Sequence, residues 1–247
     1  MQSDLLEAKA AVDWAFSQLP SLGQRIEEWS RINIDFTTEE TNIPSAYYAL
    51  VIVKKENFPL FFNAEIGAYL NTIRSSLDIL ATALAYRYGV AKPERAAFPI
   101  VDSEAKFLSG GYSAFKFING LPDTPRSIIE SLKPYKGGND ALWSLHDLDN
   151  KRKHRNLLDV AIRPITMHMH GRGPADGDFT PLPAGNIRLN EKTIIGLMLK
   201  SAPYGDMRVS TFVSFDEVGI AHRKPVTAAL AYFGSLAQSI INLFDET

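Results

Sequence analysis

Residues 145–155, LHDLDNKRKHR, carry the side chains in this chain that are best suited to chemistry. If the segment is helical, His146, Asn150 and His154 are four residues apart and share a face. Neighbouring cations lower the proton affinity of a histidine, and the same cations can hold a phosphate group. Such a set is sufficient to cleave RNA without a metal. The 2′-hydroxyl attacks, the histidine moves protons and the cations stabilise the phosphate.

The same segment also has a purely structural interpretation. Cations in the last turn of a helix complement its dipole, by about 0.3–1 kcal/mol each. Two pairs of opposite charge are spaced for ion pairing, Asp147 with Lys151 and Asp149 with Lys153. Arg152 and Arg155 are not fully neutralised by these pairs, so an anion-binding role remains open beside the structural one.

A second polar set, Asn71, Arg74 and Asp78, has spacings of three and four residues and lies close to an apolar stripe. A half-buried arginine and aspartate need partners. These partners are either each other or the 150–154 segment on a neighbouring helix. The set is therefore either an internal structural network or one wall of a pocket shared by two helices.

The helix that must position this second set is the clearest element in the chain. Apolar residues recur every three or four positions from Pro59 to Tyr88, which predicts about seven helical turns ended by Gly89. Because the stripe is continuous, we expect this helix at the centre of the fold, packed against the helix of residues 140–155.

Other helices are predicted from caps and periodicity. Ser3 begins a first helix that Pro20 ends or restarts, and a shorter helix follows it. Thr124 and Pro125 begin a helix through Leu132, and Asp140 caps the next one. A final helix occupies about residues 225–245.

Strand patterns cluster in two parts of the chain, at about residues 31–54 and 157–218. Residues 46–54 are apolar on both faces and predict a central strand, whereas Pro164 predicts a bulge or an edge. Strands that do not alternate with helices favour an α+β fold. We expect one domain over residues 1–247, with a helix-rich core at about 56–156 and a small, mostly antiparallel sheet from both halves.

Composition narrows the classes of function. The formal net charge is −2, so any attraction to phosphate must be local, and the absence of cysteine excludes disulfides, thiol nucleophiles and sulfur-ligated zinc. The first residues lack the apolar run of a signal peptide, and no window is apolar enough for a membrane span. We expect a cytoplasmic protein without membrane contact.

Four short segments, RSSLDILA (74–81), FPI (98–100), LKPY (132–135) and LWSLHDLDNKRKHR (142–155), resemble a family of uncharacterised bacterial proteins. The signature of that family is an R-S-x-L-D-H-L-A helix, an N-x-x-K-H-R helix end and then strands. The first helix is also similar to the Arg-x4-His motif of HEPN-type helical ribonucleases, but Ile79 stands at the histidine position. The resemblance implies a shared fold and the region in which the polar residues lie. Under the HEPN resemblance, His154 would have to replace the catalytic histidine that Ile79 has displaced.

Three functional hypotheses follow. The first is a non-catalytic binding or interaction module, with a stress or defence role, that binds RNA or another phosphate-containing ligand through Asp78, Asn150, Lys151, Arg152 and Arg155. The second is a metal-independent ribonuclease that uses His154, with Lys153, Arg155 or Arg74 stabilising phosphate. The third is a metal site at His168 and His170, which share one side of a strand. No cofactor is expected, and homo-oligomer formation stays open.

Overall fold

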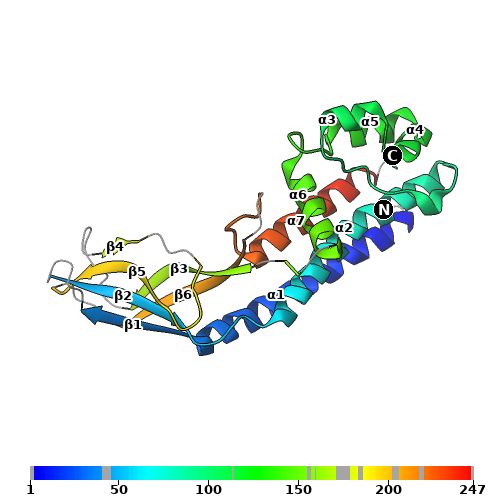
Figure 1. Cartoon of the computed structure of the whole chain (residues 1–247). Coiled ribbons are helices and arrows are strands. Elements are labelled where there is room, and N and C mark those ends of the chain that lie inside the picture. The colour runs from blue at the N-terminus through cyan, green and yellow to red at the C-terminus, as the bar shows by residue number, and fades with distance from the viewer. Residues whose placement is uncertain are drawn as a thin grey trace.

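The fold is α+β and elongated, with helices at one end and strands at the other (Figure 1). This computed structural model describes residues 3–40, 46–112, 114–154, 157–158, 160–170, 179–182, 186–201, 206–216 and 220–245. Both described ends of the chain lie at the helical end (Figure 1). They are fastened there by ion pairs from Arg87 to Asp4, at 2.7 Å, and from Lys9 to Asp245, at 2.6 Å.

Three helices build the core: α1 (Leu6–Asn33), α2 (Leu60–Arg87) and α7 (Val226–Asn242). They pack against one another, and α2 is buried on more than one side, as predicted for the central helix. Gly89, with φ +65°, follows the last turn of α2. A short 3-10 turn, η1 (Ser3–Leu5), precedes α1.

Pro20 does not end the first helix, so that prediction was wrong. Helix α1 runs through Pro20, and its buried stripe continues through Leu19, Leu22 and Ile26. A proline inside a helix removes one backbone hydrogen bond. Burial of the apolar stripe on both sides of Pro20 compensates for that loss.

The helical end is completed by α6 (Asp140–His154) and by a lobe of shorter elements. The lobe contains η2 (Pro93–Arg95), α3 (Glu104–Ser109), α4 (Phe115–Gly120) and α5 (Asp123–Ser131).

Two predicted helix starts shift slightly in this part of the chain. Helix α5 begins before Thr124, at Asp123. The cap of α6 is Asn139 rather than Asp140, because the Asn139 side-chain oxygen accepts from the Leu142 amide at 3.0 Å.

The strands form two antiparallel sheets. The larger has the order β1 (Ile34–Glu40), β2 (Tyr47–Lys54), β5 (Lys192–Leu199) and β4 (Phe179–Pro181), so both halves of the chain contribute. Strand β2 is central and its middle residues are buried, as predicted. In the smaller sheet, β3 (Val160–His170) pairs with β6 (Asp206–Phe215), and the register shifts after Pro164, where the sequence predicts a bulge.

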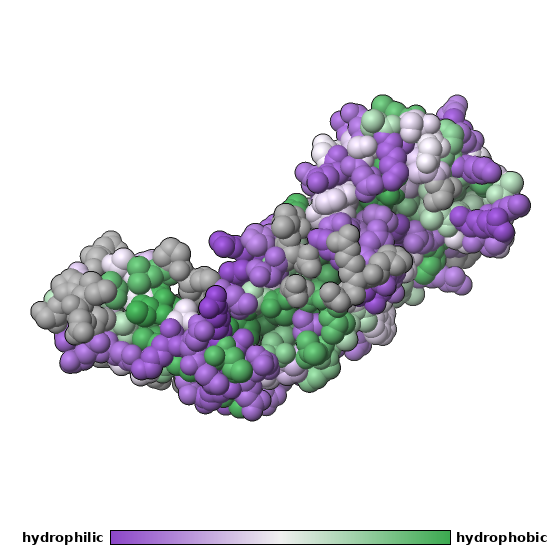
Figure 2. Space-filling view, in the orientation of Figure 1, coloured by the Kyte–Doolittle hydropathy of each residue, from purple (hydrophilic) through white to green (hydrophobic). Residues whose placement is uncertain are grey.

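The surface differs between the two ends of the molecule. Figure 2 shows a hydrophobic area at the sheet end of the molecule. In strand β5, Ile194 is 46% exposed. Within the part of the chain that the structure describes, no helix combines the length and apolar character needed to cross a bilayer.

Candidate functional site between α2 and α6

Helices α2 and α6 are far apart in sequence, yet they place polar side chains against one another. We call the resulting group the Arg74 cluster; its members are Asn71, Arg74 and Asp78 of α2 and His146, Asp149 and Asn150 of α6. On each helix these residues are spaced by three or four positions, so they follow one side of the cylinder. The packing of α2 on α6 that the sequence predicts is therefore confirmed.

Arg74 lies at the centre of the cluster and is only 5% exposed. Its Nε donates to His146 Nδ1 at 3.2 Å, its Nη1 donates to Asp78 Oδ1 at 2.8 Å, and its Nη2 donates to the Phe98 carbonyl at 3.3 Å. Asp78 Oδ1 also accepts from the Phe98 amide at 2.9 Å. All three guanidinium nitrogens therefore have protein partners, and the cluster fastens the segment at Phe98 to α2.

His146 is held in its neutral form. Burial lowers its pKa to about 4, and the positive charge of Arg74 adds to the effect. Because Nδ1 accepts from Arg74, the proton of the neutral ring belongs on Nε2, and Nε2 lies 2.9 Å from Asn150 Nδ2. Turning the Asn150 amide over places its oxygen there instead, as the acceptor that the Nε2 proton needs.

Asp149 is the most deeply buried carboxylate of the cluster, at 1% exposure. Its Oδ1 accepts from Asn71 Nδ2 at 3.2 Å, and its Oδ2 lies 2.5 Å from Lys153 Nζ. Arg152 Nη2 approaches Oδ1 more loosely, at 3.5 Å. A buried carboxylate with one amide and two cations around it is a compensated charge that links the two helices.

Lys151, Arg152 and Lys153 form what we call the basic end of α6. Lys151 Nζ pairs with Asp147 at 3.1 Å. The Arg152 stem lies against the backbone of α2 at Gly67, where a Cβ atom would come within 2.3 Å of Arg152 Cδ. Its buried Nε has no hydrogen-bond partner among the described residues. Arg152 is therefore held in place, with its Nε enclosed by protein and its Nη2 only loosely paired.

The predicted site residues thus fall into three groups. Arg74, Asp78 and Asn150 meet in the cluster, whereas Lys151, Arg152 and Lys153 lie together at the helix end. The third group comprises Arg155 and the side chains of His154, His168 and His170, which lie outside the described residues.

His146 is the central residue that the predicted site omitted. Its spacing of four from Asn150 is the only signal in the sequence that placed it on the shared face. Ile79, at the histidine position of the Arg-x4-His motif, has an apolar side chain that takes no part in the cluster's hydrogen-bond network. It lines a cavity of about 720 Å³, together with Asp78.

Comparison with known proteins adds no relative: the chain matches no protein-family model, no curated protein and no solved structure. Among the described residues, no three histidine, aspartate or glutamate side chains are grouped as metal ligands would be. The metal site at His168 and His170 stays a prediction.

Proposed function

We propose that the protein is a non-catalytic binding module that holds a phosphate-containing ligand, such as RNA, at the basic end of α6. The observation that carries this proposal is Arg152. Its stem is fixed against Gly67, its side chain is 24% exposed, and its one ion pair among the described residues, from Nη2 to Asp149, spans 3.5 Å. A positioned guanidinium whose outer nitrogen is only loosely paired is suited to phosphate.

The two lysines beside Arg152 remain partly accessible to a ligand although each forms an ion pair. The side chains of Lys151 and Lys153 are 24% and 38% exposed. The Lys151–Asp147 pair is partly exposed and contributes only about 0–1 kcal/mol, so an approaching phosphate can also contact Lys151. Lys153 is 38% exposed and can contact the phosphate while it keeps the buried Asp149 as its partner. Among the described residues, Arg152 and Lys153 share one carboxylate, that of Asp149.

Two features of the Arg74 cluster support binding rather than catalysis. Arg74 is buried and engaged through all three nitrogens. With its pKa near 4, His146 carries no exchangeable charge near neutral pH and is a poor general acid there. The cluster therefore acts in our account as the joint that holds α6, and its basic end, against α2.

The test is binding of a fluorescently labelled single-stranded RNA, followed by anisotropy over a range of salt concentrations. The wild type should bind with an affinity that falls as salt rises. Replacing Lys151, Arg152 and Lys153 together by glutamine should weaken binding at least about tenfold and lower the salt slope.

A matched control removes the same charge elsewhere. Lys55, Arg188 and Lys192 also form exposed ion pairs, but at the sheet end of the molecule. Their joint replacement by glutamine should change the affinity less than about twofold, because local charge decides phosphate binding. Equal losses in both triple variants, or salt-independent binding, would contradict the proposal.

A further inference from the structure

A second cavity, separate from the Arg74 cluster, lies in the lobe formed by α3, α4 and the end of α5. Its volume is about 310 Å³, and four aromatic side chains line it: Phe107, Tyr112, Phe115 and Tyr135. Phe107 stacks on Tyr112 with ring centroids 5.8 Å apart, and it also contacts Tyr135 at 5.7 Å. This volume lies at the lower end of the range for small-molecule sites, so the cavity suits one small ligand.

The cavity is preformed by its surroundings. Gly110 ends α3 with φ +68°, and a Cβ there would come within 2.5 Å of the Phe115 ring, so only glycine lets that ring take its place. The Tyr135 hydroxyl donates to Glu104 at 2.8 Å. That polar atom is therefore satisfied outside the cavity, and the ring presents an apolar surface inside.

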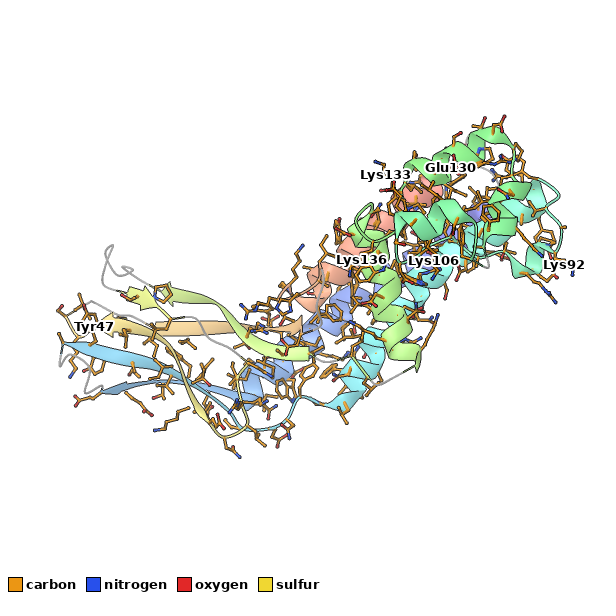
Figure 3. All side chains as sticks on the ribbon, turned by 45° about the horizontal axis from the view of Figure 1, so that its top comes forward. Tyr47, Lys92, Lys106, Glu130, Lys133 and Lys136 are labelled. Atoms are coloured by element: carbon orange, nitrogen blue, oxygen red, sulfur yellow. The ribbon has the colours of Figure 1, made fainter. Side chains whose placement is uncertain are left out.

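The rim of the cavity carries two opposite charges, Glu130 and Lys133 (Figure 3). They are three residues apart, yet neither forms an ion pair within the part of the chain that the structure describes. Two other lysines of this lobe and its neighbouring turn have partners, since Lys106 pairs with Asp102 at 2.9 Å and Lys136 lies 4.7 Å from the Trp143 ring.

Glu130 also acts on the cavity itself. The pKa of Tyr112 is raised to about 12, first by burial and then by the negative charge of Glu130. The Glu130 carboxylate is therefore close enough to the cavity to act electrostatically on the Tyr112 hydroxyl.

Lys133 is in a backbone conformation that its side chain disfavours. Its φ is +48°, in the left-handed region that glycine usually occupies just after a helix. The turn is fixed by its carbonyl, which accepts from the amides of Tyr135 and Asn139 at 2.7 and 2.9 Å. A lysine at a position favouring glycine is a local strain at the rim of a cavity, which is where functional residues often carry strain.

We propose that this cavity binds a free amino acid with an apolar side chain. The side chain enters among the four rings, the α-ammonium group faces Glu130 and the α-carboxylate faces Lys133. A simple cation would be repelled by Lys133 and a simple anion by Glu130, whereas a zwitterion satisfies both charges. Nothing in this proposal depends on phosphate binding at α6.

The first experiment is calorimetric titration of the full chain with L-phenylalanine and L-leucine. At least one should bind saturably with a stoichiometry of one. N-acetyl-L-phenylalanine, which lacks the ammonium group, and L-phenylalaninamide, which lacks the carboxylate, should each bind at least about tenfold more weakly. Absence of saturable binding by both amino acids, or binding of both analogues as tightly as L-phenylalanine, would overturn the proposal.

The second experiment separates a binding role of Lys133 from a structural one. Lys133→Gly relieves the backbone strain, so Tm should rise by about 2–4 °C while amino-acid affinity falls at least about tenfold. Lys92→Gly is the matched control, because Lys92 also has a positive φ, +58°, but lies outside the cavity. It should raise Tm and leave the affinity unchanged. Glu130→Gln, which leaves the backbone unaltered, should also weaken binding. If Lys133→Gly and Glu130→Gln both bind like the wild type, the assignment is wrong.

Discussion

The Arg74 cluster and the aromatic cavity both contain charged side chains, but these charges differ in what they contact. In the cluster, Arg74 and Asp149 are buried and compensated by protein groups. At the cavity rim, Glu130 and Lys133 are exposed and form no ion pair with described residues. The basic end of α6 lies between these extremes. The difference teaches that the partners of a charge, more than its density in the sequence, decide whether it is available to a ligand.

The largest effect should come from removing the centre of the Arg74 cluster. Arg74→Met leaves His146 Nδ1, the Phe98 carbonyl and the 40%-exposed Asp78 without their donor, and each unsatisfied buried acceptor costs about 1–3 kcal/mol. Urea unfolding of both proteins should show this loss of stability. Arg188→Met is the control, because Arg188 is 76% exposed in its ion pair and should change stability by less than about 1 kcal/mol. Similar small losses in both variants would erase the contrast between paired and available charges.

A smaller effect concerns pH. The pKa of His146 is lowered from 6.5 to about 4 in the folded protein. Between these two pH values the unfolded chain therefore binds a proton that the folded chain does not bind. The contribution of His146 to the free energy of unfolding is fully present above pH 6.5. This free energy should fall by roughly 3 kcal/mol in total as the pH drops from 6.5 to about 4.

The matched variant for this prediction is His146→Gln. Glutamine can still accept from Arg74 Nε but does not titrate. The difference in unfolding free energy between wild type and variant should therefore change with pH over the same window. A difference that is constant from pH 7 to 4 would mean that His146 titrates normally in the folded state.

The smallest expected effect sharpens the role of Arg152. Gly67→Ala places a methyl group where Arg152 Cδ now lies, so the guanidinium must move and RNA affinity should fall by about three- to tenfold. Gly23→Ala is the control, since its Cβ would meet its nearest neighbour at an ordinary 3.6 Å. Both glycines lie inside long helices, so helix propensity changes equally in the two variants. Equal RNA affinities would show that the position of Arg152 does not matter.

Much of the fold could be predicted because long periodic patterns leave few alternatives. The stripe of α2, the two buried faces of β2 and the interruption at Pro164 each led to an element that the structure contains. Pro20 misled the prediction because tertiary burial on both sides of it outweighs a local helix-breaking preference.

The site was predictable only in part. Spacing showed which residues share a helix face, and it led correctly to the meeting of Arg74 with Asn150's helix. The contact of Arg74 with His146, rather than with another α6 residue, depends on how far the two helices are displaced along each other, which spacing does not encode. The aromatic cavity was missed because its walls come from three short helices and from a left-handed backbone at Lys133.

The claim that the Arg74 cluster serves structure while the basic end of α6 binds is tested most directly by incubating labelled RNA with excess protein in chelator. Anisotropy and a denaturing gel are read from the same sample at neutral pH. We predict that the RNA is bound and remains full length. Cleavage that persists in chelator and disappears in His154→Ala would contradict the account and favour a metal-independent ribonuclease.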